Sequence, residues 1–191
     1  MITRNKALEL LHENMQSQNL RRHCYAVEAV MLALARKFQM TNVKCQIWGL
    51  VGLLHDGDYE KTKETPEKHT LLMADWLKEM GKTDPEILSA ILSHNFSHTG
   101  QNAPQNRLEW SLYCCDELTG LIVAVVLVRP DKKLSSVSVE SIMNKWNQKS
   151  FAAGVKREQI EKCEEKLGIP LPEFIGISLF AMQEIHQELG L

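Results

Sequence analysis

The hydrophobic residues of this chain recur at helical spacing over most of its length. Segment 19–38 is typical, because its apolar side chains would cover one face of a helix: Tyr25, Val27, Val30, Met31 and Leu34. No segment shows the convincing alternation of apolar and polar residues that marks a half-buried strand. The pattern therefore predicts an all-α protein.

Capping residues and breakers place the helix ends. Thr65-Pro66 and Asp84-Pro85 each put a capping side chain before a proline at the first helical position, and Thr3 and Ser138 are expected N-caps of two more helices. The polar segment 97–106 is expected to be a loop. We expect helices at about 3–15, 19–38, 43–55, 65–80, 84–94, 107–128, 138–147, 157–167 and 172–189.

Size and charge restrict the kind of protein. A length of 191 residues suits one domain covering 1–191, with 44% apolar residues for a core and 24% charged residues for a solvated surface. The net charge of −2 provides no basic field for a nucleic-acid polymer, so we expect a small-molecule partner. The longest apolar run, 121–128, is far shorter than the ~20 residues that span a bilayer, so no membrane association is expected.

Cysteine usage and absent motifs narrow the function further. The five cysteines are odd in number and include no CxxC pair, which argues against a disulfide framework or a zinc ribbon. They are expected to be reduced thiols of a cytoplasmic protein, and the polar amino terminus has no signal-peptide pattern. The chain contains no P-loop, Rossmann, zincin or GxSxG motif.

Four residues carry the candidate chemistry: His23, the pair His55-Asp56, and Asp116. Asp116 stands in an apolar helical segment, where a carboxylate is costly to bury unless it is paired or binds a metal. Two imidazoles and two carboxylates suit a divalent ion and leave octahedral positions for water and a phosphate oxygen. The alternative is a satisfied buried aspartate with unrelated histidines, but we interpret the set as a metal site.

The order His23, His55-Asp56, Asp116 resembles the signature of the HD superfamily of metal-dependent phosphohydrolases. Segments 53–60, 116–122 and 149–155 look like those of a small single-domain bacterial branch. Within the superfamily the chain is most similar to phosphohydrolases that act on nucleotides, a group that includes one in the biosynthesis of the nucleoside antibiotic oxetanocin. The resemblance covers nearly the whole chain and implies a helical bundle of about eight to ten helices.

The resemblance also implies a cofactor, one divalent ion (Co, Mn, Fe, Ni, Zn or Mg) with a possible second. In binuclear members, histidines between the HD pair and the last aspartate bind a second metal, and His69 and His94 occupy that order. They would otherwise contact substrate phosphate beside one metal, or be ordinary surface or core histidines. A single ion is our expectation, because the first four ligands form a complete set.

Other polar residues near the motifs are candidates for catalysis or substrate binding. Asp58 and Glu60 follow the HD pair in a polar stretch and would serve as general base or leaving-group acid, unless that stretch is a solvated connector. Arg22, Lys149 and Arg157 are candidate phosphate-binding cations, although each taken alone is more often a surface charge.

The expected function is hydrolysis of a phosphoester or phosphoanhydride bond in a nucleoside mono-, di- or triphosphate by a metal-activated water. Two alternatives stay open. One is a di-iron oxygenase of the HD fold, which would require His69 and His94 as ligands. The other is a noncatalytic nucleotide-binding domain that keeps the metal without turnover.

Overall fold

Helices account for most of the computed structural model, which describes residues 1–81 and 84–191 and has no β-strand within them. Its eight longer helices are α1 (Arg4–Asn14), α2 (Gln18–Lys37), α3 (Asn42–Leu54), α5 (Leu71–Glu79), α6 (Pro85–His94), α8 (Arg107–Leu127), α9 (Val139–Trp146) and α11 (Leu171–Glu184). Four single turns are α4 (Tyr59–Thr62), α7 (Phe96–Thr99), α10 (Arg157–Ile160) and α12 (His186–Leu189). The all-α prediction is confirmed.

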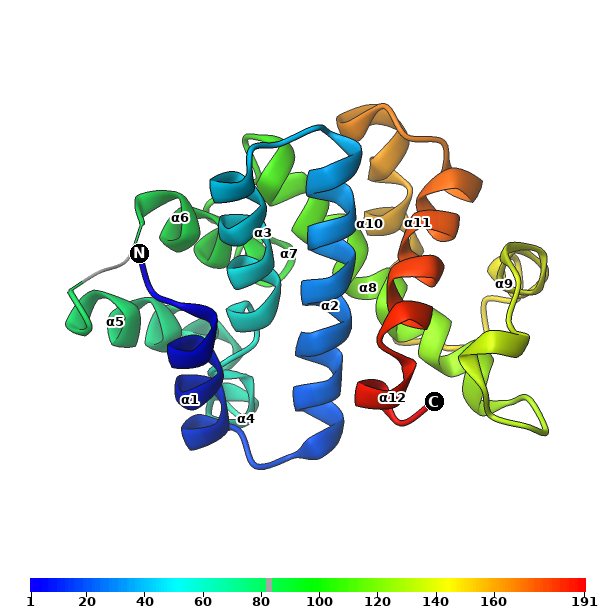
Figure 1. Cartoon of the computed structure of the whole chain (residues 1–191), viewed down its shortest axis with the longest axis horizontal. Helices are drawn as coiled ribbons and strands as arrows, with labels where there is room; N and C mark the ends of the chain where they lie inside the picture. The colour runs from blue at the N-terminus through cyan, green and yellow to red at the C-terminus, as the bar shows by residue number, and fades with distance from the viewer. Residues whose placement is uncertain (82–83) are drawn as a thin grey trace.

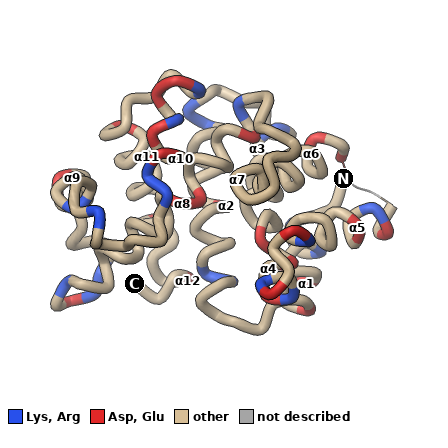
Figure 2. The backbone as a smooth tube through the Cα atoms, turned by 180° about the vertical axis from the view of Figure 1, so that it is seen from behind, with Lys and Arg blue, Asp and Glu red and all other residues tan. Residues whose placement is uncertain are grey.

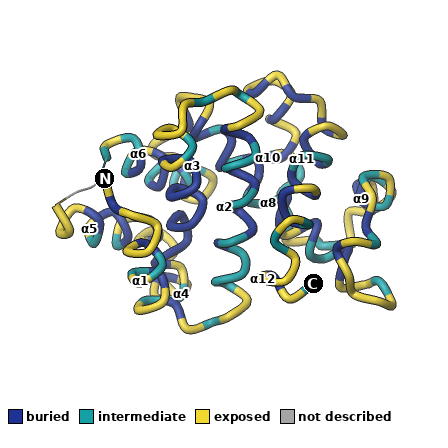
Figure 3. The backbone as a smooth tube through the Cα atoms, in the orientation of Figure 1, coloured by how far each residue is buried: buried dark blue, intermediate teal, exposed yellow. Residues whose placement is uncertain are grey.

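Helix α2 lies in the middle of the bundle (Figure 1). It contacts α3 on one side and α11 and α12 on the other, while α8 crosses behind it. Helices α2, α3 and α8 hold many of the buried residues, whereas exposed residues lie mostly at the outer turns (Figure 3). These three helices contact one another and form the core, so side chains that lie between them are buried.

Side-chain caps set several helix starts, as expected from the sequence. Thr3 accepts a hydrogen bond from the N–H of Lys6 at the start of α1, and Asp84 accepts one from Glu86 at the start of α6. Ser138 and Ser141 satisfy each other's backbone N–H groups in a capping box before α9. These predictions are confirmed because each cap depends only on residues close in sequence.

The helix expected at 65–80 is wrong, because the chain breaks in its middle. Pro66–Lys68 forms a 3₁₀ turn (η1), His69 takes an extended ψ of 137°, and Thr70 has a φ of 73° before α5 begins. The Asp58 carboxylate stabilises this break by accepting hydrogen bonds from the His69 ring and from the N–H of Met73. Such contacts are not visible in the local hydrophobic pattern, and the break leaves the His69 ring facing the interior.

Three other expected boundaries differ from the structure. The segment 97–106 does not begin as a loop, since it includes most of α7. The helix expected at 157–167 divides into α10 and a π-type turn, η3 (Cys163–Leu167). The helix expected at 172–189 divides at Ile185 into α11 and α12. A second 3₁₀ turn, η2 (Leu134–Ser136), precedes α9.

Helix α8 is the one helix in the described part of the chain that is long and apolar enough to cross a membrane, by length and composition alone. In the bundle, 56% of its apolar window is buried, and it packs against α2, α6 and α10. The buried core helix of a water-exposed protein has the same composition, so this is weak evidence for a membrane span. The helix itself was expected at 107–128, but the longest uninterrupted apolar run, 121–128, did not mark it as long and apolar enough to span a membrane, because polar residues interrupt the run.

Charged residues of both signs are intermixed along the outer turns of the bundle (Figure 2). Ion pairs such as Lys37–Glu173 and Lys44–Glu86 join neighbouring elements at the surface. The bidentate pair of Arg4 with Glu28 is different, because the Glu28 side chain is only 7% exposed and ties the start of α1 to α2.

Gly52 allows α2 and α3 to approach closely, and substitution there should destabilise the protein. A Cβ at position 52 would lie 2.8 Å from both the Cα and the N of Glu28, which are backbone atoms that cannot move aside. We expect Gly52→Ala to lower the free energy of unfolding by about 2 kcal/mol, measured by urea denaturation. Gly176→Ala in α11 is the control, since its Cβ would meet only Val139 Cγ2 at 3.6 Å. Equal effects of the two substitutions would contradict this account.

Candidate metal centre

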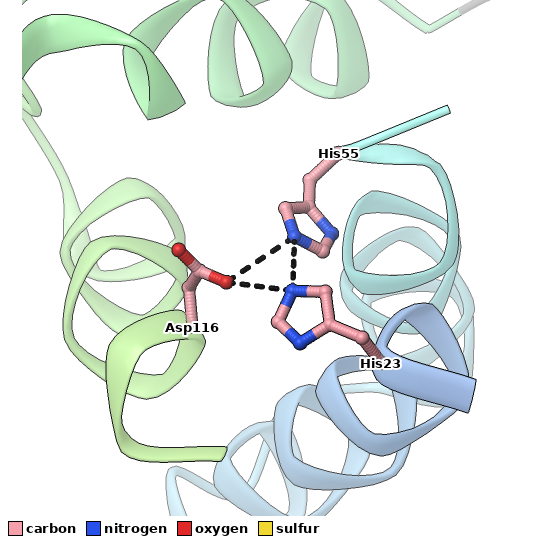
Figure 4. Close-up of side chains that lie close together, drawn as sticks. All are labelled: His23, His55 and Asp116. Atoms are coloured by element: carbon pink, nitrogen blue, oxygen red, sulfur yellow. Dashed lines mark hydrogen bonds and ion pairs between the residues drawn. The ribbon is translucent and has the colours of Figure 1, made fainter. Parts of the chain in front are cut away.

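Three side chains from different helices point at one another (Figure 4). His23 lies within α2, His55 directly follows α3, and Asp116 lies within α8. Asp116 Oδ1 is 2.9 Å from His23 Nε2 and 3.4 Å from His55 Nε2, and the two Nε2 atoms are 3.3 Å apart. His23 and Asp116, which lie 93 positions apart in sequence, are thus close enough to bind the same metal ion.

The Asp56 carboxylate lies between this group and two further histidines. Its Oδ2 is 3.6 Å from the Nε2 atoms of both His23 and His55. Its Oδ1 is 3.2 Å from the Nε2 atoms of both His69 and His94. Each oxygen of one carboxylate therefore faces its own pair of imidazoles.

Hydrogen bonds at Nδ1 orient three of the four rings. His55 Nδ1 donates to the Gly52 carbonyl at 2.8 Å, and His69 Nδ1 donates to Asp58 at 2.7 Å. His23 Nδ1 lies 3.3 Å from Thr119 Oγ1, whose hydroxyl donates to the Asp116 carbonyl at 2.8 Å. With the proton on Nδ1, as these partners favour, each Nε2 lone pair is directed into the centre.

This donor set fits a divalent cation. Four inward Nε2 atoms and two carboxylates are the ligand types that transition metals take from proteins. Two groups have ligand atoms within 4.8 Å of one another: His23, His55 and Asp116, and His55, Asp56 and His94. The Nδ1 atom of His94 is buried without a hydrogen-bond partner in the described residues. Nε2 is therefore the nitrogen of this ring that contacts Asp56 and is placed to bind a metal.

The electrostatics are those of a site that holds positive charge. Burial disfavours the charged form of His23, but the hydrogen bond and charge of Asp116, together with Asp56, outweigh it and raise its pKa to about 9. The pKa of His69 is likewise raised to about 9, against burial, by Asp56 and Asp58. Burial opposes ionisation of Asp56 and Asp116, yet the surrounding imidazoles hold the pKa of both carboxyls well below the ordinary value.

The structure does not support the proposed acid–base roles of Asp58 and Glu60, because both carboxylates are occupied by hydrogen bonds within the fold. Asp58 is fully buried, and its two oxygens accept from the His69 ring and from the N–H of Met73. Asp58 is therefore a positioning residue for His69. Glu60 Oε2 accepts from the backbone N–H groups of Gln16 and Ser17, which fastens the turn between α1 and α2.

The centre opens into a cleft of about 360 Å³. Beyond the ligands, its polar lining comes from residues that the sequence analysis did not select: Tyr59, Ser97, His98, Glu117, Lys156 and Gln159. Burial, followed by the charge of Asp116, raises the pKa of Glu117. Tyr59 packs edge-on against His69 with ring centroids 5.6 Å apart.

The cation at this cleft is Lys156. Its Nζ lies 3.1 Å from Ser97 Oγ, and it forms no ion pair with any residue in 1–81 or 84–191. Arg157, the neighbour chosen from the sequence, instead donates to the carbonyl oxygens of Trp146, at the end of α9, and of Phe151, in the turn that follows. The sequence indicated Arg157 as a candidate phosphate-binding cation, but its N–H donors are used to hold the preceding turn.

The other two cations chosen from the sequence also lie away from the cleft lining. Lys149 is exposed in the turn after α9. Arg22 lines a neighbouring cavity rather than the cleft itself. The structure therefore brings His69 and His94 to the four ligands but does not bring Arg22, Lys149 or Arg157 there.

The chain is an α-helical domain whose clustered histidines and aspartates are suited to hold a metal ion. A family model described as HD domain matches residues 20–125, more than half of the 191-residue chain, and contains His23, His55, Asp56 and Asp116. The chain belongs to the HD domain family, which implies membership of a superfamily of metal-dependent phosphohydrolases. No curated protein and no solved structure matches the chain.

Metal binding to the metal-free protein should strengthen as pH rises. Imidazoles must be neutral to bind a metal, whereas His23 and His69, each with a pKa of about 9, are protonated at pH 7. Protons therefore compete with the ion until the pH passes about 9. We expect the apparent affinity for Mn²⁺ to increase from pH 7 to pH 9, with proton release measurable by calorimetry in buffers of different ionisation enthalpy. An affinity independent of pH would contradict this ligand set.

Proposed function

We propose that this protein is a divalent-metal-dependent phosphohydrolase that acts on a small phosphorylated nucleoside. The observation that carries the proposal is the convergence of four histidine Nε2 atoms on two carboxylates, of which Asp56 is buried and Asp116 partly buried, beside an open cleft. Membership of the HD domain family supports hydrolase chemistry. The small cleft and the net charge of −2 favour a small substrate over a nucleic-acid polymer.

The proposed metal ligands form two sets that share Asp56. His23, His55, Asp116 and Asp56 Oδ2 would hold the first ion. His69, His94 and Asp56 Oδ1 would hold the second. The sequence favoured a single ion because these two histidines were less certain, and the placement of both beside Asp56 Oδ1 is what favours a second.

The chemistry requires a polarised phosphoryl group and an activated water. Divalent ions bound there would supply a Lewis acid and a coordinated water of lowered pKa. The chain's own contributions are orientation and charge: Thr119, Gly52 and Asp58 fix the imidazoles. Lys156 and Ser97 stand at the cleft wall, where a phosphate oxygen would meet an ammonium and a hydroxyl.

A di-iron oxygenase is the second candidate, because the same placement of His69 and His94 beside Asp56 also suits two iron ions. The two candidates differ in co-substrate. An oxygenase would consume O₂ and show a mixed-valent EPR signal, whereas a hydrolase would release phosphate without O₂.

Phosphate release should identify the reaction. We expect wild-type protein reconstituted with Mn²⁺, Co²⁺, Fe²⁺, Ni²⁺, Zn²⁺ or Mg²⁺ to release phosphate from nucleotides with at least one of these ions, and much less efficiently from single-stranded DNA or RNA. His94→Ala should lower this activity by about 10-fold or more and reduce the number of bound ions. Nucleotide binding without phosphate release under every ion would instead favour a noncatalytic sensor, and O₂ consumption with a mixed-valent EPR signal would favour the oxygenase.

Lys156 should contribute to phosphate binding without affecting the metals. We expect Lys156→Ala to lower kcat/KM by about 10-fold, because one charge-assisted contact to a phosphate oxygen is lost, while the metal content measured by elemental analysis stays unchanged. Lys149→Ala is the matched control, since Lys149 is an exposed lysine outside the cleft lining. Equal losses in both variants would refute the role of Lys156.

A further inference from the structure

A second cavity adjoins the metal centre along the groove between α2 and α8. It has a volume of about 410 Å³ and shares the His23 ring with the metal cleft as a common wall. The metal cleft lies at the Nε2 edge of that ring, and Thr119, which contacts its Nδ1, lines the second cavity. The groove therefore begins on the other side of the His23 ring from the metal centre.

The groove combines an apolar wall with one unpaired cation. Ala26, Val123 and Leu127 line it, and Leu127 is 52% exposed, which leaves a large apolar side chain at its edge without cover. The Arg22 guanidinium also lines it and forms no hydrogen bond or ion pair within residues 1–81 and 84–191. Five N–H donors therefore stand beside apolar surface without an acceptor from the chain.

A glycine lies directly against that guanidinium. Gly190 has a φ of +71° and also lines the groove. A Cβ at this position would lie 2.6 Å from Arg22 Nη2 and 2.8 Å from its Cζ. The chain thus leaves room for Arg22 between α2 and the turn after α12, beside the cavity.

We propose that this groove binds the base of the nucleotide, and that Arg22 selects a base with an acceptor-only edge, such as the O6 and N7 atoms of a 6-oxopurine. The proposal rests on the proposed function, because it takes the substrate to be a nucleoside phosphate. Apolar side chains cover the faces of a base, while a guanidinium donates two parallel hydrogen bonds to O6 and N7. Adenine presents an N6–H₂ donor at the same edge, which a donor-only side chain cannot satisfy.

The test compares steady-state kinetics of metal-loaded protein on GMP, AMP and p-nitrophenyl phosphate. Wild type should favour GMP over AMP in kcat/KM, and Arg22→Ala should lower that ratio roughly 5- to 100-fold through KM. Leu127→Trp should raise KM for both nucleotides relative to p-nitrophenyl phosphate by filling the groove. Arg36→Ala, an exposed arginine on the same helix, and Val128→Trp, an exposed neighbour of Leu127, are the controls and should leave these ratios unchanged.

The outcomes separate this inference from the proposed function. Hydrolysis of p-nitrophenyl phosphate with an unchanged GMP-to-AMP ratio in Arg22→Ala would overturn the base site and leave the hydrolase standing. Equal loss on GMP and p-nitrophenyl phosphate would also overturn it, by placing Arg22 at the phosphate. Calorimetric binding of GMP that depends on Arg22, without phosphate release, would support the base site and refute the hydrolase. Absence of both binding and hydrolysis would refute both.

Discussion

A buried carboxylate between two pairs of imidazoles is the constraint on which the rest of this structure depends. Asp56 is 8% exposed, and an anion at that depth is tolerated only with compensating charge or coordination. His23 and His55 face one of its oxygens, and His69 and His94 face the other. The core helices and the break before α5 are arranged so that all four rings reach it.

Gly52 and Asp58 each serve both the packing of the helices and the orientation of a metal-ligating histidine. Gly52 lets the backbones of α2 and α3 approach, and its carbonyl accepts the Nδ1 proton of His55. Asp58 stabilises the start of α5 through Met73 and fixes the ring of His69. Changes that loosen these contacts would therefore affect both the stability of the bundle and the geometry of the metal ligands.

In the metal-free protein, bound protons on the histidines supply the positive charge that metal ions would otherwise supply. Histidines with a pKa raised to about 9 carry the positive charge that the buried carboxylates require at neutral pH. A raised histidine pKa stabilises the folded state fully below pH 6.5, the ordinary value, and this contribution is lost as pH passes the folded value. Metal ions would replace that charge, and binding them would release the histidine protons.

The sequence by itself determined the helical class, most helix starts and the four-residue order His23, His55-Asp56, Asp116, because caps, periodicity and motif order are local or linear properties. Only the tertiary structure decided what lies beside those residues. The Asp58–His69 contact breaks a helix that the local pattern predicts as continuous, and Lys156 rather than Arg157 faces the cleft. Both outcomes depend on which hydrogen bonds the folded chain forms, those of Asp58 with His69 and Met73 and those of Arg157 with the carbonyls of Trp146 and Phe151, and spacing along the chain does not encode these contacts.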